Sequence, residues 1–153
     1  MKIGKYLTLN DLINSATATR YGIDNTPPKE AIDDLTNIVK FVYDNLSDHI
    51  SGVHVSSGYR SVKLNKKIGG SATSQHCKGQ ALDLVMTGKG TNTNASIFNY
   101  ILHNLDFDQL IWEFGTKVQP QWVHVSYKVS SNRKLVLKAI KENGKTKYVP
   151  YKK

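Results

Sequence analysis

Apolar side chains recur every three or four residues between Lys29 and Leu46, the spacing that places them on one face of a helix. They are Ile32, Leu35, Ile38, Val39, Val42, Tyr43 and Leu46. The same spacing predicts a second long helix from Asn94 to Leu105. A short helix is expected to begin at Thr8, because Thr8 and Asp11 have the spacing of a helix-capping box. Glycine and proline between residues 22 and 28 predict a loop.

Other segments have the residue types and the alternation of β-strands. Strands are predicted over Val53–Ser56, Gln80–Met86, Gln109–Phe114 and Trp122–Tyr127. Near the C-terminus, Lys134–Ile140 and Thr146–Val149 predict a hairpin joined through Glu142-Asn143-Gly144, because Asn-Gly favours the positive φ values of a tight turn.

These elements predict one α+β domain over residues 1–153, with N-terminal helices packed on a mostly antiparallel sheet. Residues 133–153 are predicted to form a basic C-terminal hairpin or tail. A chain of 153 residues is long enough for one core. Its single cysteine, Cys77, excludes an internal disulfide, so packing or a bound metal has to supply the stability.

The formal net charge of +9 predicts attraction to a polyanion: nucleic acid, an anionic membrane face or an acidic wall polymer. No helix-turn-helix, zinc-finger or RNP pattern supports nucleic-acid recognition. No window approaches the ~20 apolar residues of a membrane span, so we expect no membrane insertion. The N-terminus lacks the pattern of a secretory signal, and synthesis in the cytoplasm is expected. A monomer is expected.

His76, Asp83 and His124 are candidate metal ligands. Asp83 and His124 lie on two of the predicted strands, where side chains alternate between the two faces. His76 lies in the loop before the first of these strands. A carboxylate on an otherwise apolar strand is costly unless it is paired or coordinated, and two histidines with a carboxylate are a common zinc ligand set. The alternative stays open: Asp83 caps a backbone group at the sheet edge, and each histidine is an isolated polar residue.

Several motifs together resemble the D-alanyl-D-alanine carboxypeptidase-like zinc peptidases, and most of all their small, single-domain carboxypeptidase type. They are Ser74-Gln75-His76-x-x-Gly79-x-Ala81-x-Asp83, Trp122-Val123-His124-Val125-Ser126, Ser57-Gly58-Tyr59-Arg60-Ser61 with Asn65, Tyr6-Leu7-Thr8-Leu9, and Gly22-Ile23-Asp24-Asn25-Thr26-Pro27. The resemblance covers about residues 5 to 127. It implies a zinc-dependent peptidase that cleaves stem peptides of bacterial peptidoglycan.

By the same resemblance, His76, Asp83 and His124 hold one Zn²⁺ per chain on a face of the sheet. Arg60 holds the substrate or its developing oxyanion, and Gln75 is a second candidate donor to that oxygen. One branch of the family has a glutamate three residues before the last histidine. That position is Gln121 here, which cannot accept a proton, so Glu113 is the expected general base.

The expected function is therefore a zinc metallopeptidase of the carboxypeptidase or endopeptidase type, acting on a peptidoglycan stem peptide. A bacteriophage lysis or entry enzyme is the expected setting, acting at the cell wall after release or as part of a virion, with the basic tail attached to the anionic wall. The alternative is a non-catalytic, zinc-stabilised module that binds peptidoglycan or another polyanion.

Overall fold

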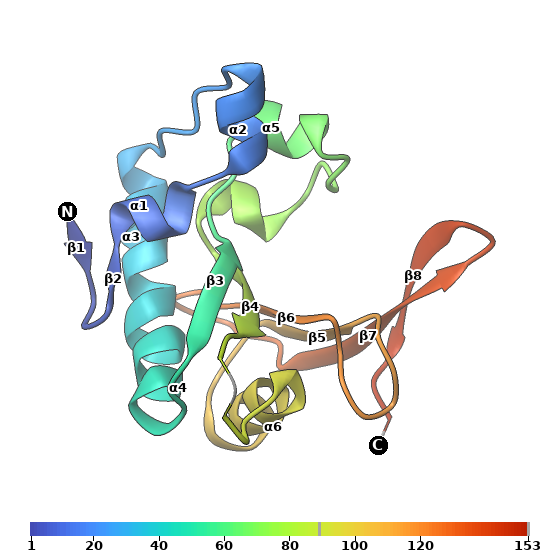
Figure 1. Cartoon of the computed structure of the whole chain (residues 1–153). Helices are drawn as coiled ribbons and strands as arrows, with labels where there is room; N and C mark the ends of the chain where they lie inside the picture. The colour runs from blue at the N-terminus through green and yellow to red at the C-terminus, as the bar shows by residue number, and fades with distance from the viewer. Residues whose placement is uncertain (89, 153) are drawn as a thin grey trace.

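The computed structural model describes residues 1–88 and 90–152, and within them the chain folds as an α+β structure around a six-stranded sheet (Figure 1). The order of the strands across the sheet is β3-β4-β6-β5-β7-β8. Their bounds are β3 Val53–Ser57, β4 Ala81–Met86, β5 Gln109–Glu113, β6 Trp122–Ser126, β7 Leu135–Glu142 and β8 Lys145–Pro150. Neighbouring strands are antiparallel except β5 and β7, which are parallel. The predicted α+β class and mostly antiparallel sheet are confirmed.

The predicted helix over residues 29–46 is a continuous helical rod that extends to His49. It consists of α3 (Lys29–Ile38), a π-helical segment, η1 (Val39–Tyr43), and α4 (Asp44–His49). The second long helix, α6, spans Asn94–Asn104 and begins at a Thr93–Ser96 capping box. The expected Thr8–Asp11 box begins α1 (Leu9–Ile13).

Shorter elements were not predicted from the hydrophobic pattern. They are β1 (Lys2–Ile3), β2 (Leu7–Thr8), α2 (Ala16–Tyr21), α5 (Val62–Lys67) and the 3-10 turn η2 (Gln75–Lys78). Each is six residues or fewer, and α2 and α5 each bury few side chains. A helix of that length shows too little apolar periodicity to be recognised in a sequence.

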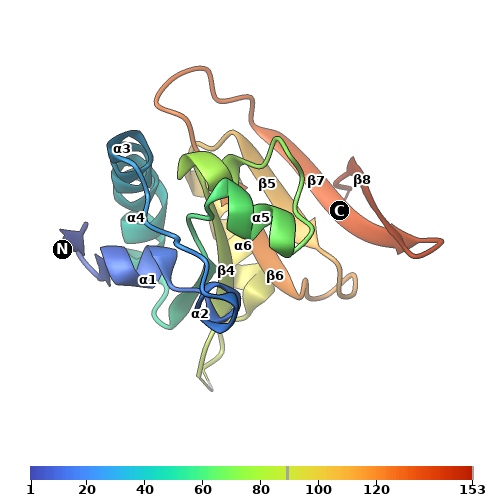
Figure 2. The ribbon, with the colours of Figure 1, turned by 90° about the horizontal axis from the view of Figure 1, so that it is seen from above.

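The two faces of the sheet have different environments. Leu82, Leu84, Val123, Val125 and Leu110 are buried in the core with residues of the rod and of α6. Because side chains alternate along a strand, the residues between them lie on the opposite face. Figures 1 and 2 show α5 and η2 on that opposite side, above β4 and β6.

The C-terminal hairpin is part of the main sheet. β7 pairs with β5 over Gln109–Glu113, and β8 pairs with β7. Asn143 and Gly144, which join the two strands, have φ values of 53° and 76°, as the Asn-Gly turn predicted. In Figure 1 the hairpin rises at the end of the sheet away from α3, on the same side as α5. Among the described residues, no helix is long and apolar enough to cross a membrane.

Candidate metal centre and cleft

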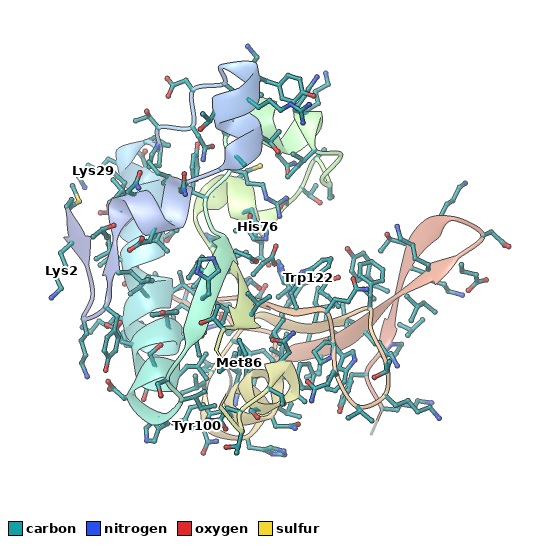
Figure 3. All side chains as sticks on the ribbon, in the orientation of Figure 1. Lys2, Lys29, His76, Met86, Tyr100 and Trp122 are labelled. Carbon is teal, nitrogen blue, oxygen red and sulfur yellow. The ribbon has the colours of Figure 1, made fainter. Side chains whose placement is uncertain are left out.

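A cleft of about 870 Å³ lies on the face of the sheet opposite the core helices. Its floor comes from β4, β6 and β5, one wall from residues 68–80, and the other from the β7–β8 hairpin. In Figure 3 the labelled side chains of His76, from the wall, and of Trp122, from β6 in the floor, lie on this side of the sheet. The cleft therefore joins segments that are far apart in the sequence.

His76, Asp83 and His124 meet at the centre of this cleft. Asp83 and His124 are directly opposite one another on β4 and β6. Asp83 Oδ1 lies 3.3 Å from His76 Nε2 and 3.0 Å from His124 Nδ1. The three side chains offer ligand atoms that all lie within 4.8 Å of one another. Sequence reasoning expected this convergence, and the pairing of β4 with β6 produces it.

The orientation of His76 is set by the turn that contains it. Ser74 caps η2 at its start, and Gly79 ends it with φ of 74°. A Cβ at Gly79 would lie 2.4 Å from the Ala31 carbonyl oxygen, so only glycine fits. His76 Nδ1 lies 2.7 Å from the Gly58 carbonyl oxygen. Since a carbonyl only accepts, Nδ1 carries the proton and Nε2 presents its lone pair to the cleft.

The lack of a hydrogen-bond partner for the buried His76 Nε2 supports its role as a metal ligand. Nε2 is buried, yet within the described residues it has no hydrogen-bond partner, although Asp83 Oδ1 is close. A buried nitrogen with a free lone pair is costly unless it is coordinated. The residues present therefore fit a bound cation, and two imidazoles with one carboxylate match the ligand set of a catalytic zinc site.

The protonation states also fit a metal site. Burial lowers the pKa of His76 and outweighs the opposing effect of Asp83, so the imidazole is neutral. Burial acts to raise the pKa of Asp83, but the contact of its Oδ1 with His124 Nδ1 at 3.0 Å helps to hold that pKa well below its usual range. A neutral imidazole and an ionised carboxylate are the forms that bind Zn²⁺.

Arg60 lies beside the metal ligands and is held in place by neutral and acidic groups. Its Nε donates to Ser57 Oγ at 3.1 Å, and Nη1 donates to Asn65 Oδ1 at 3.0 Å. Nη2 is 3.4 Å from Asp83 Oδ2. Three of its five N–H groups thus fix the guanidinium in the wall of the cleft.

Glu113 also faces the cleft, from the last position of β5. It pairs with Trp122, two residues before His124 on β6, and only 6% of Glu113 is exposed. Burial raises the pKa of Glu113 to about 7, with Asp83 acting in the same direction and His124 and Arg60 opposing it. A carboxyl group with a pKa near neutrality is suited to accept and return a proton.

Gln75 contacts a buried acid that sequence reasoning missed. Its Nε2 donates to Asp108 Oδ2 at 3.1 Å. Asp108 is fully buried and also accepts from Arg133 Nε at 3.0 Å and Nη2 at 2.7 Å. Gln75 lines the cleft, but its role as a donor to the oxyanion stays a prediction. A signal for Asp108 is present in the sequence, because the acid follows the apolar residue Phe107, which is buried. An acid among apolar residues is also the signal that identified Asp83.

The comparison with protein families agrees with a zinc site in this cleft. The family model described as Peptidase M15 matches residues 5–126, which is most of the chain. A comparison with curated proteins found no match.

The region that matches the Peptidase M15 model contains all three candidate metal ligands, Arg60 and Glu113, and it ends before the hairpin. M15 peptidases depend on zinc, and among the residues that the structure describes one group of side chains is placed to bind it. The chain belongs to the peptidase M15 family, the D-alanyl-D-alanine carboxypeptidase-like zinc peptidases, and is a metallopeptidase for substrates of the peptidoglycan type.

Proposed function

We propose that this metallopeptidase hydrolyses one peptide bond in the stem peptide of bacterial peptidoglycan, as a D-alanyl-D-alanine carboxypeptidase or an endopeptidase. The observation that supports it most is the common position of the ligand group and Glu113. All four side chains line one cleft that is open to a peptide.

In this proposal His76, Asp83 and His124 hold the zinc ion. When bound, zinc supplies Lewis acidity, which lowers the pKa of water and polarises a carbonyl. Glu113 accepts the proton of the attacking water and returns it to the departing amine. Its pKa near 7 makes both transfers accessible at neutral pH.

Arg60 is proposed to hold the substrate carbonyl or a terminal carboxylate. Its contacts with Ser57, Asn65 and Asp83 fix the cation before substrate arrives. A cation that needs no rearrangement stabilises the charge that develops on the scissile carbonyl oxygen. We further propose Gln75 as a second donor, which requires its amide to leave Asp108.

Hydrolysis is tested with purified muropeptides and the zinc-loaded protein, with and without a chelator. The expected result is a new product that is absent after chelation and restored by added zinc. Mass spectrometry of the products identifies the bond: loss of a terminal D-alanine marks a carboxypeptidase, and separation of a larger fragment marks an endopeptidase. Binding of muropeptides without any product would instead support the non-catalytic, zinc-stabilised module.

For the biological setting we propose lysis or entry by a bacteriophage. The net charge of +9 supports an enzyme that stays on an anionic wall while it acts. The test is turbidity of a wall suspension, which should fall on addition of the protein and should not fall when zinc is chelated. A protein that trims soluble muropeptides but leaves wall turbidity unchanged would argue against a lytic role.

A further inference from the structure

The C-terminal hairpin lies beyond the region that matches the M15 family, yet it forms one wall of the cleft. The match ends at residue 126, whereas β7 and β8 span Leu135–Glu142 and Lys145–Pro150. Lys141, Thr146 and Tyr148 of the hairpin line the same cleft as the metal ligands. The substrate environment on this side therefore comes from residues that the family resemblance does not cover.

The strand register aligns Tyr148 with the proposed base. Glu113 on β5 is opposite Ala139 on β7, and Ala139 is opposite Tyr148 on β8. Residues opposite one another across a sheet share a face, so all three lie on the cleft side. Neighbouring strands are about 4.8 Å apart, which places the Tyr148 backbone about 10 Å from that of Glu113.

The residue between them does not itself line the cleft. Ala139 is fully buried and has only a methyl side chain, whereas Glu113 and Tyr148 both line the cleft. The row Glu113, Ala139, Tyr148 therefore presents a carboxyl group to the cleft at one end and a phenol at the other.

The phenol of Tyr148 is available to a ligand. The hydroxyls of Tyr43 and Tyr100 bond within the protein, to the Val53 carbonyl and to His49. Tyr148 instead lines the cleft and is 54% exposed. Partial burial, together with the Glu113 and Asp83 carboxylates, raises the pKa of Tyr148, so its hydroxyl keeps its proton and is a donor.

The surroundings of Tyr148 suit a peptide. Phe114 and Trp122 are in contact at the same end of the cleft, with ring centroids 5.5 Å apart. Lys141 Nζ lies 5.4 Å from the Phe114 ring and 3.2 Å from Thr146 Oγ1. Aromatic surfaces and hydrogen-bond donors bind the apolar and carbonyl groups of an extended peptide.

We propose that Tyr148 is a substrate-binding residue whose hydroxyl donates a hydrogen bond to a carbonyl oxygen of the peptide, on the side of Glu113 away from the metal centre. This inference rests on the proposed hydrolysis of a stem peptide. It assigns the hairpin a direct part in substrate recognition, in addition to any attachment to the wall.

The test compares Tyr148→Phe with Tyr151→Phe in the full, zinc-loaded chain. Tyr151 packs against Phe98 and Trp112 on the core side, so it is a matched control on the same segment. Tyr148→Phe should lower kcat/KM for a stem peptide about 3- to 10-fold, the usual effect of one neutral hydrogen bond. Zinc content and Tm should not change. Tyr151→Phe should leave kcat/KM unchanged.

Binding is measured separately from turnover by placing both changes in a Glu113→Gln background. Calorimetry with the stem peptide should then show weaker binding for Tyr148→Phe alone. Equal affinity of the two tyrosine variants, together with equal kcat/KM, overturns the role of Tyr148 and leaves the proposed function intact. If the Glu113→Gln protein binds the peptide but the wild type never cleaves it, the proposed function fails while the binding comparison still decides on Tyr148. A wild type that neither binds nor cleaves the peptide overturns both.

Discussion

The metal end and the hairpin end of the cleft are built in different ways. At the metal end, Asp83 and His76 are buried, and neighbouring groups hold both. At the hairpin end, Lys141 and Tyr148 are exposed on the last two strands of the sheet. The family match covers the first region and not the second. Groups that stabilise developing charge work best when they are already fixed, whereas recognition of a peptide tolerates exposed side chains.

The largest effect is expected from removal of metal ligands. A chain with both Asp83→Ala and His124→Ala retains one of the three ligands, so zinc affinity should fall at least about 10²-fold. Loss of a residue that only hydrogen-bonds to a ligand has a smaller effect. Peptidase activity should disappear with the metal. Elemental analysis should find one zinc per wild-type chain and almost none in the variant.

An exposed histidine provides the control for this experiment. His103→Ala removes an imidazole on α6, outside the ligand group, and should leave zinc content unchanged. Unaltered zinc occupancy in the double variant would show that the metal binds elsewhere. The buried group His76, Asp83 and His124 would then not be the metal site.

Glu113→Gln should cause the next largest loss. The amide keeps the size of the side chain but cannot accept a proton, so turnover should fall about 10²-fold or more while zinc content stays the same. Gln121→Glu, added to this variant, places a carboxylate where another branch of the family has one and tests whether that position reaches the same water. A Glu113→Gln enzyme with more than about half the wild-type rate would exclude Glu113 as the base.

The pH dependence of turnover gives an independent measure of Glu113. Burial raises its pKa to about 7, and the base is active only when deprotonated. A bound cation favours the ionised form, so the rate of the zinc enzyme should rise with pH through a midpoint at or below about 7. This acid limb should be absent from the residual activity of Glu113→Gln. An unchanged limb in the variant would assign it to another group.

Asp108 connects η2 with the segment just before β7, and its loss should lower stability moderately. It binds Gln75 beside His76 and Arg133 just before β7. Asp108→Asn should reduce the free energy of unfolding at pH 7 by about 1–3 kcal/mol, because Arg133 and Gln75 lose a charged acceptor. Chemical denaturation measures this difference. Asp33→Asn, which removes only an exposed pair with Lys29, should change stability little.

Acidification should remove this contribution. The hydrogen bonds from Arg133 hold the pKa of Asp108 well below its usual range, despite the opposing effect of burial. The stabilisation is therefore complete above the unfolded-state pKa of about 3.9 and is lost as pH falls toward the folded-state pKa. The gap between wild type and Asp108→Asn should narrow as pH falls below about 4. A gap that widens on acidification would contradict this assignment.

A moderate effect, on attachment and not on turnover, is expected from neutralising exposed lysines of the hairpin region. Lys134, Lys145 and Lys152 are exposed, and changing all three to Gln should weaken binding to wall fragments about tenfold at low ionic strength. Turnover of a small soluble peptide should not change. The control variant changes three exposed lysines outside the hairpin region, Lys2, Lys29 and Lys63, to Gln and so removes the same charge. Equal weakening in both triple variants would show that net charge, and not the hairpin, determines attachment.

Substitution is a better test than removal of the hairpin. Ala139 is fully buried in the sheet, and Tyr151 packs against Phe98 and Trp112. Truncation from Arg133 would strip these contacts and leave β5 as an unpaired edge. A truncated chain would lose both wall binding and turnover for reasons of stability.

Much of the fold follows from local sequence patterns. The apolar spacing from Lys29 to Leu46 predicts the rod, because a helix places every third or fourth residue on one side. Asn143-Gly144 predicts the hairpin turn, because both residues tolerate positive φ. The isolated carboxylate of Asp83 on an apolar strand indicates a paired or coordinated acid. Each of these signals depends only on residues close together in the chain.

The composition of the cleft depends on contacts between distant segments, which local patterns do not contain. The parallel pairing of β5 with β7 brings Tyr148 into line with Glu113. Only the folded chain places Asp108 between Gln75 and Arg133. Residue spacing determines which face of a strand a side chain occupies, but which strands become neighbours is decided by the packing of the whole core. For that reason the sequence alone indicated the metal ligands, and the tertiary structure identified the second wall of the cleft.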